Sequence, residues 1–201
     1  MKKLVPILVA LSLFAACADD SPQTIQLTMR TSMGVIELEL YPEKAPLTVA
    51  NFVRLADGGH LDGGTFYRTV SPENDNGAPV ISVIQGGIGD AESPFPPIAH
   101  ETTLQTGLPH VDGSLSMARS EVGTASTEFF ICIGAQPALD FAGTRNADGE
   151  GFAVFGQVVS GMEVVHAIHQ APADAPTEFA YFQNQLINEP VVIESVKRSA
   201  P

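Results

Sequence analysis

Positive charge and cysteine are both scarce in this sequence. Ten Lys and Arg residues stand against 23 Asp and Glu, and the formal net charge is −13. Nucleic acids and anionic membrane surfaces are held by Lys and Arg, so this balance argues against both as partners. Of the two cysteines, Cys17 lies in a leader and Cys132 in an apolar run typical of a buried strand. We therefore expect no disulfide between them and an inert, buried thiol at Cys132.

The N-terminus also lacks an apolar run long enough to span a bilayer, because residues 4–14 are apolar but too short. Two lysines precede this stretch, as in an export signal. Residues 14–17, FAAC, then resemble a bacterial lipobox, in which the cysteine becomes the lipid-modified first residue of the mature protein. We expect residues 1–16 to be a signal peptide and residues 17–24, beginning with a lipidated Cys17, to be a polar tether.

The residue after the lipobox cysteine indicates a destination. Ala18 stands there rather than Asp, which in the bacterial sorting pattern favours the outer membrane. The protein is then expected as a lipoprotein on the periplasmic side of that membrane. The alternative is a signal peptide cut near the same position, which would leave a soluble periplasmic protein.

The rest of the chain consists of short patterned segments separated by turns. The 18 Gly and 15 Pro favour frequent turns over long helices. Residues 45–56 and 162–169 have helical spacing, and Pro46 suits the first turn of the earlier segment. Alternating or short apolar runs predict strands over residues 25–29, 35–40, 65–70, 80–85, 113–118, 128–133, 153–159 and 191–196. Many short strands with two helices indicate a closed antiparallel barrel or a sandwich, and the pattern alone does not decide between them.

Five short motifs occur in a fixed order along these strands. They are FYRTV at 66–70, VIQGG at 83–87, LSMA at 115–118, EFFI at 128–131 and FAVFG at 152–156. Together they resemble the cyclophilin family of peptidyl-prolyl cis–trans isomerases. The late segments FQN at 182–184 and EPVVI at 189–193 look most like the periplasmic bacterial branch of the family.

The resemblance to cyclophilins implies a fold and an activity. The fold is all-β, a closed eight-stranded antiparallel barrel capped by two α-helices, over a domain of residues 25–198. The activity is acceleration of X–Pro bond isomerisation in unfolded or newly exported polypeptides, which assists folding in the cell envelope. No cofactor and no metal are expected.

Arg68 matches the catalytic arginine of the family. Rotation about an X–Pro bond crosses a barrier of ~18–20 kcal/mol because it breaks amide resonance. In the twisted state the proline nitrogen regains a basic lone pair, so a fixed donor beside it favours that state. An arginine is always charged and presents its N–H groups in a rigid fork. By strand periodicity, we expect Arg68 to share a face with Phe66 and Val70.

The resemblance also implies a peptide groove on the outside of the barrel. Small residues over 120–127 leave the backbone approachable, and an extended peptide is expected to lie near Ala118, Arg119 and Ser120. Gln85 matches the glutamine that orients the catalytic arginine. The remaining expected contacts are Val83, Phe130 and Leu139 in the proline pocket and Phe152 at its rim.

Three positions depart from the family pattern. Glu128 stands where glutamine is usual, and it can pair with Arg119 or Arg68, or favour basic peptides. Ser82 stands where a pocket phenylalanine is usual, which is expected to weaken the grip on proline. Ala138 replaces an aromatic residue that aids cyclosporin binding in the family, so we expect weak cyclosporin inhibition.

Two insertions, residues 71–79 and 142–151, are expected near the groove, where they would alter access. Residues 181–188 carry no chemistry that the sequence assigns. The departures keep a second hypothesis open, a non-catalytic peptide-binding chaperone or scaffold. A third hypothesis is an envelope protein whose acidic surface is its function and whose groove is vestigial.

Histidines outside these motifs suggest other chemistry only weakly. His166 and His169 share a helical face but lack a third metal ligand nearby in the sequence. His110 precedes Asp112 in a loop with no nucleophile motif around it. We expect neither pair to form a catalytic centre.

Overall fold

The computed structural model describes residues 23–89 and 91–199. The expected signal peptide, the lipobox and Cys17 lie outside these residues. Within the described part, no helix has the length and apolar character that crossing a membrane would require.

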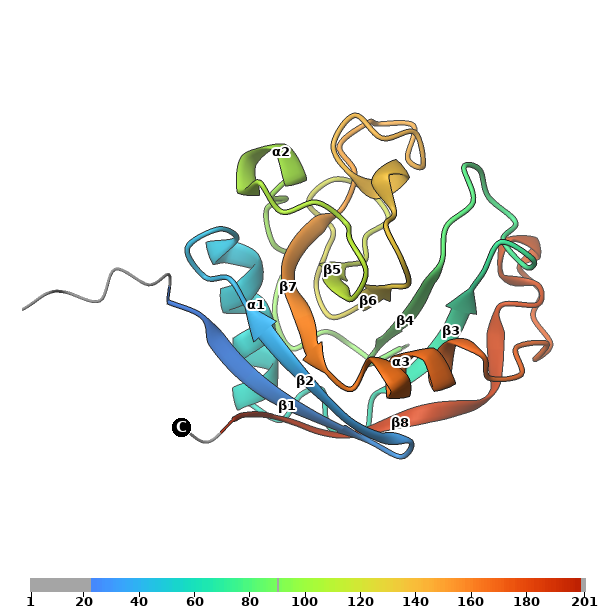
Figure 1. The fold of residues 1–201 in the computed structure, drawn as a ribbon, viewed down its shortest axis with the longest axis horizontal. Helices are drawn as coiled ribbons and strands as arrows, with labels where there is room; N and C mark the ends of the chain where they lie inside the picture. The colour runs from blue at the N-terminus through green and yellow to red at the C-terminus, as the bar shows by residue number, and fades with distance from the viewer. Residues whose placement is uncertain (1–22, 90, 200–201) are drawn as a thin grey trace, which may run out of the picture.

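Eight antiparallel strands close into a barrel (Figure 1). The order around the barrel is β1-β2-β7-β5-β6-β4-β3-β8. This confirms the barrel and excludes the sandwich. The strands are β1 (Ile25–Thr31), β2 (Gly34–Leu40), β3 (Thr65–Val70), β4 (Val83–Gly87), β5 (Ser114–Met117), β6 (Phe129–Cys132), β7 (Ala153–Ser160) and β8 (Leu186–Arg198).

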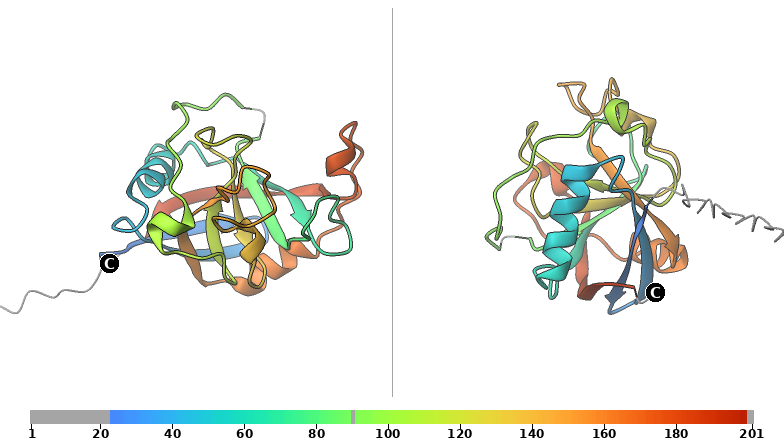
Figure 2. Two further views of the ribbon diagram at one scale, coloured as in Figure 1. Left: turned by 90° about the horizontal axis from the view of Figure 1, so that it is seen from above. Right: turned by 90° about the vertical axis from the view of Figure 1, so that its left-hand side faces the viewer.

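Helices cover the barrel from two directions. The helix α1 (Pro46–Asp57) packs against β7 and β8, and α3 (Met162–His169) packs against β2, β3 and β4 (Figures 1 and 2). Both were expected. A single additional turn, α2 (Thr103–Thr106), is too short to leave a periodic signal in the sequence. Two 3₁₀ turns, Pro137–Leu139 and Ala180–Phe182, complete the regular structure.

Aromatic rings fill the middle of the barrel. Phe52 from α1 meets Phe129 edge to face, with ring centroids 5.4 Å apart, and Phe66 meets the same ring at 5.6 Å. All three side chains are fully buried. Such contacts add to the stabilisation from burial alone, so the closed barrel is a rigid platform for its outer face.

A β-bulge in β3 corrects the expected placement of Arg68. Phe66 and Arg68 pair with the consecutive residues Gly86 and Gln85 of β4, so Tyr67 is an extra residue. Phe66 packs inside the barrel, whereas Val70 belongs to a separate cluster on the outside. The prediction that Arg68 shares a face with Phe66 was wrong, because a bulge resets the alternation of a strand. The bulge turns Arg68 outward.

Candidate active site

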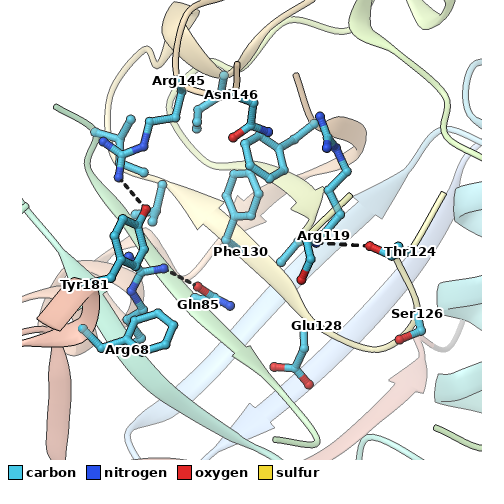
Figure 3. Close-up of a pocket in the computed structure, with 17 residues that line it drawn as sticks. Arg68, Gln85, Arg119, Thr124, Ser126, Glu128, Phe130, Arg145, Asn146 and Tyr181 are labelled. Carbon is cyan, nitrogen blue, oxygen red and sulfur yellow. Dashed lines mark hydrogen bonds between the residues drawn. The ribbon is translucent and has the colours of Figure 1, made fainter. Parts of the chain in front are cut away.

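A cleft of about 480 Å³ lies on the outer face of the barrel (Figure 3). Its walls come from β3, from β4 and the residues just before it, from β6, from the loops that follow β5 and β6, and from the 3₁₀ turn Ala180–Phe182. Every residue expected at the peptide site lines this cleft except Ser82. The cleft therefore brings together Arg68, Val83, Gln85, Ala118, Arg119, Ser120, Glu128, Phe130, Leu139 and Phe152.

An apolar pocket occupies one part of the cleft. Phe130 lies in it with only 5% of its surface exposed, and Phe152 meets its ring edge to face at 5.3 Å. Behind Phe130 the buried imidazole of His110 stacks at 5.8 Å with an interplanar angle of 8°. Val83 and Leu139 are buried in the same cluster. Apolar walls of this kind suit a proline ring.

Ser82 does not contribute to the pocket, which corrects the expectation from the sequence. Because Val83 faces the cleft, the preceding residue faces the opposite way. The Ser82 hydroxyl lies 3.1 Å from Nε2 of His169 on α3. Ile81 lines the pocket instead. The pocket thus lacks an aromatic ring on this side, but an aliphatic side chain closes it.

Arg68 is fixed at the other side of the cleft and is 7% exposed. Its Nη1 donates to Oε1 of Gln85 at 2.8 Å, as the sequence predicted. Its Nε and Nη2 donate to Oε1 of Gln185 at 2.9 and 2.6 Å. The guanidinium carbon lies 5.1 Å from the ring centroid of Tyr181 and 5.0 Å from that of Phe182. A guanidinium has five N–H groups, so two remain for a ligand.

Gln85 is itself held from the far side. Its Nε2 donates to the hydroxyl of Tyr67 at 2.8 Å. This contact fixes the amide so that its oxygen faces Arg68. Burial, followed by the nearby charge of Glu128, raises the pKa of the Tyr67 hydroxyl far above its usual range, and the phenol stays neutral.

Three segments that are distant in the sequence build the outer wall of the cleft. Arg145 donates to both carboxylate oxygens of Asp75 at 2.7 and 2.8 Å and to the Tyr181 hydroxyl at 2.9 Å. Burial raises the pKa of Asp75, but hydrogen bonds from Arg145 and two backbone N–H groups outweigh it and hold the pKa below its usual range. The insertion 142–151 therefore lines the cleft through Arg145 and Asn146, and the insertion 71–79 contacts this wall through Asp75, so both lie near the groove as expected.

Glu128 pairs with neither Arg119 nor Arg68, the two partners considered from the sequence. Arg119 donates to Asp148 at 2.8 and 2.9 Å. Three N–H groups of Arg68 donate to Gln85 and Gln185. One oxygen of Glu128 accepts from the Gly89 N–H at 3.1 Å. A Cβ at Gly87 would collide with this carboxylate, so the glycine leaves room for it.

A Ser-His-Asp arrangement lies beneath the pocket but cannot act on a substrate. His110 Nδ1 lies 2.7 Å from Asp140, and His110 Nε2 lies 3.0 Å from the hydroxyl of Ser116. His110 is 2% exposed and Ser116 is 0% exposed. A nucleophile must reach a substrate carbonyl, and here Phe130 covers the serine. The group supports the floor of the pocket.

The other reactive side chains are also used in packing. Burial raises the pKa of the Cys132 thiol well above its usual range, which makes it a poor nucleophile. Nε2 of His169 lies 2.9 Å from the carbonyl oxygen of Val70. Within residues 23–89 and 91–199, no three His, Cys, Asp or Glu side chains form a group that could hold a metal ion.

Sequence patterns placed the insertion 142–151 near the groove, but they did not identify the individual residues of the outer wall. The cleft is also lined by Tyr181 and Phe182, in the short 3₁₀ turn Ala180–Phe182, and by Arg145 and Asn146, in an irregular loop. Gln185, which is fully buried against Arg68, was also missed. The adjacent rings of Tyr181 and Phe182 in a polar segment were the one available signal, because exposed aromatics often mark binding surfaces.

The outer cleft of this closed barrel contains a fixed guanidinium and an apolar pocket. Such a cleft is suited to an extended, proline-containing peptide. Comparisons with known proteins agree with this class. Residues 26–198 match the family model described as cyclophilin type peptidyl-prolyl cis-trans isomerase/CLD. The chain therefore belongs to the cyclophilin-type peptidyl-prolyl cis–trans isomerases, and the activity expected from the sequence motifs is confirmed at this level.

Individual relatives have similar length and sequence. Peptidyl-prolyl cis-trans isomerase A of Dickeya dadantii is 36% identical over 173 residues, which cover 84% of this chain and 82% of the relative. A peptidyl-prolyl cis-trans isomerase of Acinetobacter baylyi is 32% identical over 174 residues, with the same coverage. The crystal structure of a cyclophilin type isomerase from Cryptosporidium parvum covers 89% of this chain and 99% of its own, with a TM-score of 0.68 and 18% identity. That structure supports the fold.

Proposed function

We propose that this isomerase acts in the bacterial cell envelope on newly exported polypeptides and assists their folding. The observation that carries the catalytic assignment is the position of Arg68. Its guanidinium is held in place by two glutamines and lies in one cleft with the apolar pocket. When the proline ring enters the pocket, the two remaining N–H groups can donate to the proline nitrogen as amide resonance breaks. The donor is fixed before the substrate arrives, so it favours the twisted state over either planar form.

Substitution of Arg68 tests this mechanism. Loss of one such donor typically costs about 10²–10³-fold in rate, so Arg68→Ala is expected to lower kcat/KM for a short X–Pro peptide by that factor. Arg54→Ala is a matched control, since Arg54 also stacks on a ring, at 3.6 Å from Phe95, but lies outside the cleft. Equal activity of wild type and Arg68→Ala would remove Arg68 from the mechanism. Circular dichroism verifies that each variant folds.

A non-catalytic peptide-binding chaperone remains the second candidate. It is favoured by Ile81, which gives the pocket an aliphatic wall where the resemblance to cyclophilins leads us to expect a ring, and by the carboxylate of Glu128 inside the cleft. Such a protein would delay aggregation of an unfolded client without accelerating prolyl isomerisation. Measuring both properties on the same preparation separates the two functions.

The envelope location rests on the N-terminal sequence, with Cys17 as the proposed lipid attachment site on the outer membrane. The described chain begins on the side of the barrel away from the Ala180–Phe182 turn that borders the cleft (Figures 1 and 2). An anchor at Cys17 would therefore leave the cleft open to clients. Cys17→Ala is expected to shift the protein from the membrane fraction to the soluble periplasm. Soluble wild type would instead support a cleaved signal peptide without lipid.

We further propose that cyclosporin inhibits this protein weakly. Ala138 has no ring to offer at the position where many relatives have an aromatic residue, and it does not line the cleft. Ala138→Trp is then expected to increase inhibition. Strong inhibition of the wild type would contradict the proposal.

A further inference from the structure

Glu128 occupies its own part of the cleft. It lines the same cleft as Phe130, two residues further along the chain. Figure 3 shows its carboxylate on the side of Ser126, away from Tyr181 and Arg145. The proline pocket and the carboxylate therefore lie next to each other along the path of a bound peptide.

The carboxylate is only partly satisfied by the protein. Oε1 accepts from the Gly89 N–H at 3.1 Å, and the Thr127 hydroxyl approaches it at 3.5 Å. Oε2 is buried and makes no hydrogen bond within 3.5 Å among the described residues, although the Tyr67 hydroxyl lies close enough to interact with the carboxylate. A buried oxygen of a charged group that lacks a donor is costly. A cation placed in the cleft beside this carboxylate would offset that cost through the attraction of opposite charges.

No cation of the cleft neutralises Glu128. Arg119 is bound to Asp148, and it also donates to the carbonyl oxygen of Gly151 at 2.9 and 2.6 Å. Arg145 is bound to Asp75. Arg68 faces its two glutamines. Each guanidinium at the cleft thus has a partner other than Glu128.

The side chain of Tyr67 beside Glu128 is a neutral phenol and does not offset the charge of the carboxylate. The hydroxyl of Tyr67 lies beside Glu128 and keeps its proton, because burial and the carboxylate charge both raise its pKa. The chain as a whole carries a net charge of −13. A field of this sign increases the local concentration of basic peptides.

We propose that Glu128 is a specificity-determining residue that selects client segments with Lys or Arg two residues from the proline. The spacing follows from strand geometry. Residues two apart on a strand are separated by roughly 7 Å, which is the offset between Phe130 and Glu128. A peptide extended along the cleft advances by the same amount, so a side chain two positions from a proline seated at Phe130 reaches Glu128. The glutamine usual in relatives carries no charge and would not discriminate in this way.

This inference rests on the proposed peptide site, and its test separates the two. Peptides with one proline would carry Lys, Gln or Glu two residues before it or two residues after it. Their affinity is measured by NMR titration, and their isomerisation rate by exchange spectroscopy on the same samples. The wild type is expected to bind the Lys peptide about tenfold more tightly than the Glu peptide at one of the two positions, and the ratio should shrink with added salt.

Glu128→Gln is the decisive variant, because it keeps the shape and removes the charge. It is expected to abolish the preference for lysine while retaining isomerase activity. Glu121→Gln is the matched control, an exposed acid in the neighbouring loop that does not line the cleft. It should leave the preference intact. An unchanged Lys-to-Glu ratio in Glu128→Gln, or no ratio in the wild type, overturns the selection by Glu128. Affinity is measured independently of the isomerisation rate. If the wild type prefers lysine peptides but does not accelerate isomerisation, only the enzymatic function is refuted.

Discussion

Replacing Asp75 by alanine tests whether the wall beside Arg68 is an integral part of the folded barrel. The carboxylate of Asp75 accepts two hydrogen bonds from Arg145, at 2.7 and 2.8 Å. It accepts two more from the backbone N–H groups of Gly77 and Ile81, each at 2.9 Å. The Asp75 side chain is 0% exposed and that of Arg145 is 4% exposed. Removal of the carboxylate therefore leaves a buried cation without its counter-ion.

The expected cost can be placed at the lower end of the range for buried pairs. Removing one partner of such a pair costs about 3–5 kcal/mol, but Arg145 keeps hydrogen bonds to the Pro79 carbonyl and the Tyr181 hydroxyl. A value of about 3 kcal/mol follows. In a domain of this size each kcal/mol lowers Tm by about 2–4 °C, so Asp75→Ala should melt about 6–12 °C below the wild type. The assay is thermal unfolding followed by circular dichroism.

Asp57→Ala is the matched control for this experiment. Asp57 forms the same kind of bidentate contact with Arg198, at 3.0 and 2.8 Å, but the two side chains are 48% and 52% exposed. Exposed pairs contribute about 0–1 kcal/mol, so Tm should fall by at most about 4 °C. Equal shifts of Tm in the two variants would refute the reasoning, since burial would then make no difference.

Three further predictions follow from the site. Burial lowers the pKa of His110 below its ordinary value. As the pH drops below about 6.5, the unfolded state therefore takes up a proton before the folded state does, and the free energy of unfolding should fall. Urea unfolding between pH 5 and 8 should show this dependence in the wild type and a shallower one in His110→Gln. Phe130→Ala removes the floor of the pocket and should weaken binding of a proline peptide more than tenfold in an NMR titration, whereas unchanged affinity would place the proline elsewhere. Ser82→Phe should destabilise the protein by about 1–3 kcal/mol through overpacking against His169, and a gain in isomerase activity instead would show that position 82 faces the pocket.

Local patterns were sufficient to predict the strands and the two long helices, because alternation and helical spacing are properties of neighbouring residues. The fourth strand shows the limit. It was expected over residues 80–85 but spans Val83–Gly87, since Gly86 and Gly87 pair with β3 despite the poor strand propensity of glycine. The bulge at Tyr67 was likewise invisible, because a period of two assumes a regular strand.

The residues of the inner part of the site were predictable, whereas the side-chain contacts of the outer part were not, for a physical reason. Val83, Gln85 and Phe130 lie on paired strands, so motif and register place them together. Gln185 lies 117 residues from Arg68, and Arg145 lies 70 residues from Asp75. Contacts over such separations depend on how loops close in three dimensions, and no local pattern encodes them.

These distant contacts also explain how one arginine can serve as a fixed donor. A free arginine side chain samples many rotamers, and ordering it costs up to about 2 kcal/mol. In this protein the bulge at Tyr67 aims Arg68 outward, while Gln85 and Gln185 accept three of its hydrogen bonds. The orientation is thus set during folding and not during binding. The remaining N–H groups are available when the proline nitrogen becomes basic, and catalysis follows from that prior alignment.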